Sequence, residues 1–277
     1  MPREATTDTT LTVQGVTIPK LGLGTSLLTG DDCVVAVRDA LELGYDHIDT
    51  ARAYGNEEQI GEGVHDSGRN RDEIFLTTKL WYTDLSAVGV HDQLEQSLRD
   101  LRTEYVDLLL IHWPNPEFPL ARTLDAMLEA REAGRVRHIG VANFPGAMLR
   151  QALEHTPLIC NQIEYHPYLG QPQALELARE HDLMVTAYSP LAQGELLDDP
   201  VIGEIAAAHD AAPAQVVLRW LLDQPNVAAI PKAASHEHRA ANLAVYTLEL
   251  SDEERGRIAG LERGHRTTDP SFAPDWD

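Results

Sequence analysis

The chain has 277 residues, 43% of them hydrophobic, which is enough for a sizeable core and fits the length of one α/β barrel. Its formal net charge of −22 excludes nucleic acid and anionic membrane as partners, because such a surface repels them. No stretch has the ~20 apolar residues of a membrane span, and Met1–Thr10 has no apolar signal core, so we expect a soluble, cytoplasmic protein.

The predicted elements begin with a short β-hairpin, in which Leu11–Val13 and Val16–Ile18 flank the turn Gln14-Gly15. Eight short apolar strands follow, most of them rich in Val, Ile or Leu, as buried parallel strands are. In chain order they are Leu21–Gly24, Tyr45–Ile48, Ile74–Thr78, Val106–Ile111, Val136–Val141, Cys160–Glu164, Met184–Tyr188 and Val227–Ile230.

Helical patterns fill the gaps between these strands. One begins near Asp31-Asp32 and stops at Gly44, and apolar stripes continue the series at Val90–Leu101, Leu120–Ala130, Ala174–Ala178 and Val216–Leu222. No linker divides the chain, so residues 1–277 are predicted to form a single (β/α)8 TIM barrel domain with the hairpin at its start. A doubly wound sheet is disfavoured, since Leu21–Gly24 lacks the third glycine of a dinucleotide-binding turn.

Polar residues follow three consecutive predicted strands, at the end where barrel enzymes place their active sites. Asp49 follows the second strand and Tyr54 comes shortly after it, Lys79 follows the third strand, and His112 follows the fourth. Each has a common structural interpretation alone, such as a helix cap for the aspartate. Their gathering at one end of the barrel favours a catalytic site.

The four residue types suit the reduction of a carbonyl group. A tyrosine has a reference pKa near ~10, too high for an efficient proton donor at neutral pH. We expect the cation of Lys79 to lower the pKa of Tyr54. Asp49 then keeps the lysine charged and oriented, and His112 hydrogen-bonds the carbonyl oxygen.

Seven motifs in order now show a resemblance to the aldo-keto reductase family, from about Leu21 to the chain end. The prokaryotic members, such as 2,5-diketogluconate reductases, are the most similar in their short loops. The matching segments are Asp49–Asn56 (DTARAYGN), Thr77–Trp81 (TTKLW), Asp107–Pro114 (DLLLIHWP), Ile139–Phe144 (IGVANF), Asn161–Pro167 (NQIEYHP), Ala187–Leu191 (AYSPL) and Ile230–Lys232 (IPK).

The resemblance implies an NAD(P)H-dependent reductase of aldehydes or ketones with Tyr54 as general acid. It implies that Asn143 and Gln162 hold the nicotinamide carboxamide and that Tyr188 stacks on the nicotinamide ring. It also implies that Trp81 and Trp113 line the substrate pocket. The other implied cofactor contacts are Gly24, Thr25, Ser26, Leu191, Gln193, Gly194, Lys232, His238, Arg239 and Asn242.

Departures from the family pattern bear on the choice of cofactor. Ala142 stands in place of a serine beside the carboxamide site. In the family, the segment after the last strand binds the 2′-phosphate of NADPH. Here Lys232 of that segment is present, but Ala233 replaces a serine. His238 replaces an arginine, and Arg239 lies one place further along the chain. We therefore expect NADPH as cofactor with NADH also used.

Two other functions remain as alternatives. Lys79 could act as a Schiff-base nucleophile, although Asp49 works against this by stabilising the cation. The chain could instead be an NADPH-binding regulatory or sensor member of the same fold with little turnover. The twelve histidines show no metal-binding spacing, so no metal is expected. Cys33 and Cys160 are interpreted as reduced thiols, and we expect a monomer.

The basic residues are three lysines and nineteen arginines. High acid with little lysine is typical of salt-adapted cytoplasms, where carboxylates keep a hydrated surface soluble while salt screens charge. An ordinary acidic protein from a GC-rich genome is the alternative. In either case each lysine, being rare, is a candidate for a specific role.

Overall fold

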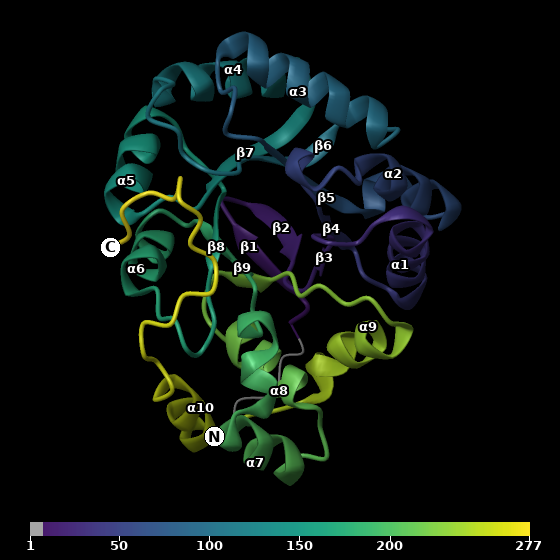
Figure 1. Ribbon diagram of the computed structural model, residues 1–277, viewed down its shortest axis with the longest axis vertical. Helices are drawn as coiled ribbons and strands as arrows, with labels where there is room; N and C mark the ends of the chain where they lie inside the picture. Colours follow the sequence, from purple (N-terminus) through teal and green to yellow (C-terminus); the bar gives the residue numbers. More distant parts are fainter. Residues whose placement is uncertain (1–7) are drawn as a thin grey trace.

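Eight parallel strands curl into a barrel surrounded by helices in the computed structural model, which describes residues 8–277 (Figure 1). The strand order β3 to β10 follows the chain, and a parallel bridge between Leu21 and Ala229 joins the two edge strands and closes the barrel. The polar start Met1–Thr7 lies outside the described residues. The strands are β3 (Leu23–Gly24), β4 (His47–Asp49), β5 (Phe75–Leu80), β6 (Val106–Ile111), β7 (Val136–Ala142), β8 (Cys160–Glu164), β9 (Met184–Tyr188) and β10 (Val227–Ala229).

The predicted hairpin is confirmed and consists of β1 (Thr10–Val13) and β2 (Val16–Pro19), paired antiparallel. It lies at the amino-terminal end of the barrel. Its turn residue Gln14 donates through the side chain to the carbonyl oxygen of Leu158 at 2.7 Å and through the backbone to Asp182 at 2.5 Å, just ahead of β8 and β9. The hairpin therefore covers one end and leaves the carboxyl ends of the strands as the site-bearing face.

The predicted helical stripes lie within helices except at Leu101, which is the C-cap of α3, and five further helices of residues 8–277 were not among the predictions. The predicted ones are α1 (Gly30–Leu43), α3 (Ala87–Asp100), α4 (Leu120–Glu132), α6 (Pro172–Glu180) and α8 (Pro213–Leu222). The additional ones are α2 (Glu57–Asp66), α5 (Gly146–His155), α7 (Pro200–Ala208), α9 (His236–Leu243) and α10 (Asp252–Ala259), and four short 3-10 turns are η1 (Arg52–Tyr54), η2 (Arg71–Glu73), η3 (Ala192–Asp198) and η4 (Ala244–Thr247).

Three predicted boundaries at the start of the barrel are wrong by one or two residues, and the first of them is that β3 begins at Leu23 instead of Leu21. Helix α1 begins at Gly30 after the N-cap Thr29, and Asp31 lies in its first turn, where a carboxylate favours the helix dipole. The second strand begins at His47 instead of Tyr45, because the backbone N–H of Tyr45 still bonds to the Ala40 carbonyl at the helix end. Two site-bearing strands also end later than predicted: Asp49 is the last residue of β4, and Lys79 lies within β5, which ends at Leu80.

Gly24 has a packing reason to lack a side chain. A Cβ atom at this position would lie 2.4 Å from the Ile230 carbonyl oxygen, so β3 and the chain after β10 approach closely only with glycine. The same close approach brings the predicted cofactor residue Gly24 beside the segment that leads to Lys232.

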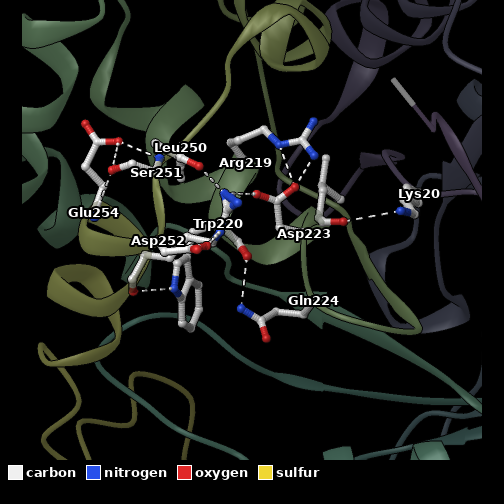
Figure 2. A network of polar contacts seen from close by, with 11 residues as sticks. Lys20, Arg219, Trp220, Asp223, Gln224, Leu250, Ser251, Asp252 and Glu254 are labelled. Carbon is white, nitrogen blue, oxygen red and sulfur yellow. Dashed lines mark hydrogen bonds and ion pairs between the residues drawn. The ribbon is translucent and has the colours of Figure 1, made fainter. Parts of the chain in front are cut away.

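Lys20 has a structural role at the end of the barrel opposite the site. Its Nζ donates to the Leu222 carbonyl oxygen at 3.3 Å, at the carboxyl end of α8, where a cation is favoured. Figure 2 shows the surrounding network, in which Arg219 bonds to Asp223 and Gln224 to the Trp220 carbonyl oxygen. One of the three lysines is therefore a helix cap and not a site residue.

Both cysteines are buried and free, as expected. Burial raises the pKa of Cys33 to about 11 and that of Cys160 to about 12, so both thiols stay protonated at neutral pH. Within residues 8–277, no helix combines the length and the apolar character needed to cross a membrane.

Candidate active site

Four of the predicted side chains meet at the carboxyl end of the barrel. Asp49 ends β4, Tyr54 lies in η1, Lys79 lies in β5 and His112 follows β6. The Lys79 Nζ donates to Asp49 Oδ1 at 2.5 Å and to the Thr50 carbonyl oxygen at 2.9 Å, and lies 3.5 Å from the Tyr54 hydroxyl oxygen. The Tyr54 and His112 rings meet edge to face with centroids 5.7 Å apart.

The Lys79–Asp49 ion pair is buried, with the two side chains 0% and 1% exposed. Burial disfavours the ammonium, but the charge of Asp49 and the neighbouring Tyr54 outweigh it, and the pKa of Lys79 is raised above its usual value. Lys79 therefore remains a cation at neutral pH, directly beside the phenol.

The expectation that Lys79 lowers the pKa of Tyr54 below its usual value is wrong in its net direction. Burial of the phenol raises this pKa, and the lysine charge offsets only part of the increase. Tyr54 therefore keeps its proton at neutral pH. The contribution of Lys79 is to make the loss of that proton less unfavourable than burial alone would leave it.

His112 is neutral in this setting. Burial and the charge of Lys79 hold the pKa of His112 well below its usual value. Its backbone carbonyl oxygen accepts a hydrogen bond from Asn143 Nδ2 at 2.9 Å, which ties the end of β6 to the end of β7. A neutral imidazole keeps one N–H to donate, as the orientation of a carbonyl oxygen requires.

The three residues predicted around the nicotinamide lie beside this cluster. Asn143, which has a φ of 62°, accepts a hydrogen bond on Oδ1 from the Tyr188 hydroxyl at 2.7 Å. Asparagine tolerates this left-handed conformation better than most residues. Gln162 donates through Nε2 to Asp49 Oδ2 at 2.7 Å, so both carboxylate oxygens of Asp49 are engaged. Ala142 is buried in the barrel interior.

The loop after β9 has an unusual backbone. Ser189, Ala192 and Gln193 have φ angles of 44°, 48° and 53°, and Gly194 has 103°. Non-glycine residues adopt positive φ rarely, and several in one loop favour a functional constraint. Leu191, Gln193 and Gly194 are the residues predicted to cover the pyrophosphate.

The predicted phosphate-gripping segment lies between β10 and α9. Lys232 is exposed, and no hydrogen bond or ion pair joins its side chain to another described residue. Ala233 is buried, and His238 is exposed near the start of α9. Arg239 points inward and is 2% exposed, so its assignment as a direct cofactor contact is corrected: its guanidinium is bonded to Asp39 and to backbone carbonyls.

Comparisons with known proteins identify the family of this chain. The family model of the aldo/keto reductases matches residues 20–263. The chain belongs to the aldo/keto reductase family. It is 40% identical over 268 residues to a methylglyoxal reductase DkgB of Salmonella typhimurium, covering 95% of this chain and 100% of the relative. As a family member it is an NAD(P)H-dependent oxidoreductase.

Solved structures give the same result. A structure provisionally assigned as a 2,5-diketo-D-gluconic acid reductase B superposes with a TM-score of 0.94 at 39% identity, covering 97% of each chain. The aldose reductase of Schistosoma japonicum superposes with a TM-score of 0.88 at 33% identity, covering 94% of this chain and 93% of its own. The predicted barrel and the predicted prokaryotic type are therefore confirmed.

Asn56 is a positioning residue of this aldo/keto reductase that the sequence analysis did not single out. It is 1% exposed, and its Nδ2 donates to the carbonyl oxygens of Thr25 and Leu28, each at 2.9 Å. Its Oδ1 accepts from the Thr50 hydroxyl at 3.0 Å. Asn56 thereby fixes the segment of the predicted cofactor residues Thr25 and Ser26 against the end of β4. Its place in the motif Asp49–Asn56 was the available signal.

Glu164 anchors the carboxyl-terminal tail to the barrel. This carboxylate, 0% exposed at the end of β8, accepts hydrogen bonds from the Thr267 backbone and hydroxyl at 2.6 Å and from the Thr268 backbone at 2.9 Å. Burial alone would raise the pKa of Glu164, but these bonds and one from His166 lower it. The sequence motif contains Glu164 but does not reveal that it holds the tail.

The tail lies against the two tryptophans that were predicted to line the substrate pocket. Phe272 stacks on Tyr82 with ring centroids 4.3 Å apart and contacts Trp81 and Trp113 edge to face at 5.8 and 5.5 Å. Trp276 contacts Trp113 at 6.0 Å. Trp81 in turn contacts the His112 ring, with centroids 5.3 Å apart. The tail therefore folds onto the barrel mouth and contributes aromatic side chains next to the site.

Proposed function

We propose that this chain reduces aldehydes or ketones with hydride from NADPH or NADH, and that Tyr54 is the proton donor. The observation that carries the proposal is the buried Lys79–Asp49 pair, whose ammonium is 3.5 Å from the Tyr54 hydroxyl oxygen. A buried ion pair is weak evidence for stability. Its position beside a phenol therefore favours a role in proton transfer.

Reduction adds a hydride to the carbonyl carbon and a proton to the carbonyl oxygen, which gives an alcohol. The nicotinamide cofactor supplies the hydride when it is bound. Tyr54 gives its hydroxyl proton to the oxygen, and Lys79 stabilises the phenolate that remains. His112 donates an N–H to the same oxygen and fixes its position relative to Tyr54.

The donor set fits a nicotinamide cofactor. The side-chain amides of Asn143 and Gln162 can pair with a carboxamide, and the Tyr188 ring, partly exposed at the end of β9, offers a flat surface for stacking. Lys232 offers a cation for a phosphate. We assign the remaining contacts to Gly24, Thr25, Ser26, Leu191, Gln193, Gly194, His238 and Asn242.

We take small carbonyl compounds as the substrate class, with methylglyoxal as the first compound to test because a 40% identical relative is named for it. The experiment measures reduced-cofactor oxidation with a panel of aldehydes and ketones. Saturable turnover with at least one member supports the proposal. Tight cofactor binding without turnover of any member contradicts it and favours a regulatory role.

Cofactor choice gives the first testable prediction. His238 stands where the family pattern has an arginine, and an imidazole lacks the planar fork that holds a phosphate in a bidentate, charge-assisted contact. We expect the wild type to use both cofactors. His238→Arg should shift kcat/KM selectivity toward NADPH by about 1–2 kcal/mol, the scale of the net contribution of one hydrogen bond.

The measurement is kcat/KM with each cofactor for wild type and variant. The matched control is His91→Arg, because His91 lies on α3, away from this segment, and is paired with Glu129 of α4 at 3.3 Å. That variant should leave the selectivity unchanged. A wild type that already rejects NADH by a thousandfold or more would contradict this interpretation of the segment.

We further propose that the protein works in a salt-adapted cytoplasm, as a monomer with a small-molecule substrate. The net charge of −22 makes the folded chain repel itself at low salt. The melting temperature should therefore rise strongly from low salt to molar potassium chloride. Most of this rise should occur below ~1 M salt, because the Debye length has fallen to about 3 Å at that concentration and the surface charges are then largely screened.

Thermal unfolding across a potassium chloride series tests the salt proposal. A melting temperature that stays flat or falls over this range contradicts salt adaptation and favours an ordinary acidic protein. Activity with the best substrate, measured over the same series, separates loss of folding from inhibition of binding by chloride.

A further inference from the structure

Arg239 is a buried arginine between two helices that lie side by side, α9 and α1 (Figure 1). Its Nε donates to Asp39 Oδ2 of α1 at 2.6 Å. Its Nη1 donates to the carbonyl oxygens of Ala233 and Ala234 at 3.0 and 2.8 Å. Burying a guanidinium is unfavourable unless it is paired and hydrogen-bonded. These three bonds therefore fix both the arginine and the short segment before α9.

The two carbonyl bonds determine where the following amides point. The peptide bonds of the described chain are trans, and in a planar trans peptide the C=O and the next N–H point in opposite directions. With the carbonyls of Ala233 and Ala234 turned toward Arg239, the N–H groups of Ala234 and Ser235 point away from it. Neither of these amides donates to another described residue.

We infer that Arg239 is a positioning residue of the cofactor site, which aims the Ala234 and Ser235 amides at the 2′-phosphate of NADPH without touching it. The inference rests on the proposed use of NADPH. Lys232, exposed next to this segment, supplies the positive charge. Two oriented amides and one cation together make an anion site, and the amides replace part of what the hydroxyl missing at Ala233 would provide.

The role requires an arginine at this position. One guanidinium reaches a carboxylate and two carbonyl oxygens at once because its donors form a rigid fork, whereas a lysine ammonium is a single point. The charge of Arg239 is also already paired with Asp39. Arg239 therefore acts through the shape of the segment and not as a free cation at the surface.

The experiment uses two nucleotides that the enzyme does not turn over, 2′,5′-ADP and 5′-AMP, with calorimetry on the full chain. The two nucleotides differ only in the 2′-phosphate, so the ratio of their dissociation constants measures the contribution of this phosphate to binding. The expected result for Arg239→Met is a ratio at least tenfold less favourable to 2′,5′-ADP. Affinity for 5′-AMP should stay within twofold.

Arg71→Met is the matched control. Arg71 also bonds to one aspartate, Asp107, and to two carbonyl oxygens, those of Ile74 and Tyr105, but at the opposite end of the barrel. It should lower the melting temperature and leave the nucleotide ratio unchanged. If Arg239→Met does not fold, the double variant Asp39→Leu with Arg239→Met removes the orphaned carboxylate and is measured in its place.

Asp39→Asn separates positioning from direct contact. A positioning role predicts weaker 2′,5′-ADP binding, since the guanidinium loses the partner that orients it. A direct phosphate contact predicts tighter binding, since the arginine is released, and this result overturns the inference. An unchanged ratio in Arg239→Met also overturns it, as does a wild type that binds both nucleotides equally. The proposed reductase function fails separately, if the wild type reduces no carbonyl compound.

Discussion

Tyr54→Phe is expected to lower kcat for carbonyl reduction at least ~100-fold, because the substitution removes the proton donor and keeps the ring. The dissociation constant of NADPH should stay within about twofold, since no predicted cofactor contact is lost; losing one would typically cost ~1 kcal/mol or more. The measurement combines steady-state reduction of the best carbonyl substrate with fluorescence titration of the cofactor. A loss confined to kcat identifies the hydroxyl as the reacting group.

Tyr105→Phe is the control for the chemical change itself. The Tyr105 ring lies between Arg71 and Arg137 with guanidinium carbons 4.3 and 4.2 Å from its centroid, at the amino-terminal end of the barrel. Its hydroxyl should not affect turnover. Wild-type turnover in Tyr54→Phe would remove the phenol from the mechanism.

The pKa of Tyr54 shows where sequence reasoning reached its limit at the site. The motifs correctly predicted that Asp49, Lys79 and Tyr54 meet, because the carboxyl ends of adjacent parallel strands lie at one edge. They could not predict the net direction of the Tyr54 pKa. That direction depends on how much burial opposes the lysine, and burial is a property of the folded chain.

Arg239 and the tail show the same limit for long-range contacts. A helical pattern predicts that neighbouring residues point about 100° apart, but not that Arg239 meets Asp39, two hundred residues earlier. The contact of Phe272 with Trp81 likewise depends on Glu164 holding Thr267. Strand order was predictable because each strand pairs with the next strand along the chain. The contacts of Arg239 and Phe272 join segments that are far apart in the sequence, and no periodicity in the sequence links those segments.

The Lys79 ion pair allows catalysis and stability to be separated in one experiment. Lys79→Met removes the cation beside Tyr54 and leaves Asp49 buried with only Gln162 and no counter-charge. Orphaning one member of a buried pair costs about 3–5 kcal/mol. For a chain of this size that is a fall in melting temperature of roughly 5–10 °C. Carbonyl reduction should fall at least ~100-fold, because the phenolate loses its stabilising charge.

The double variant Asp49→Asn with Lys79→Met distinguishes the two effects. An asparagine keeps the shape and the hydrogen bond to Gln162 but carries no charge, so most of the lost stability should return. Reduction should stay lost, since nothing replaces the ammonium beside the phenol. Activity that returns with stability would mean that the pair only holds the fold, and full activity in Lys79→Met would exclude the lysine from the mechanism. If stability returns and activity does not, the charge of Lys79 serves the chemistry of Tyr54.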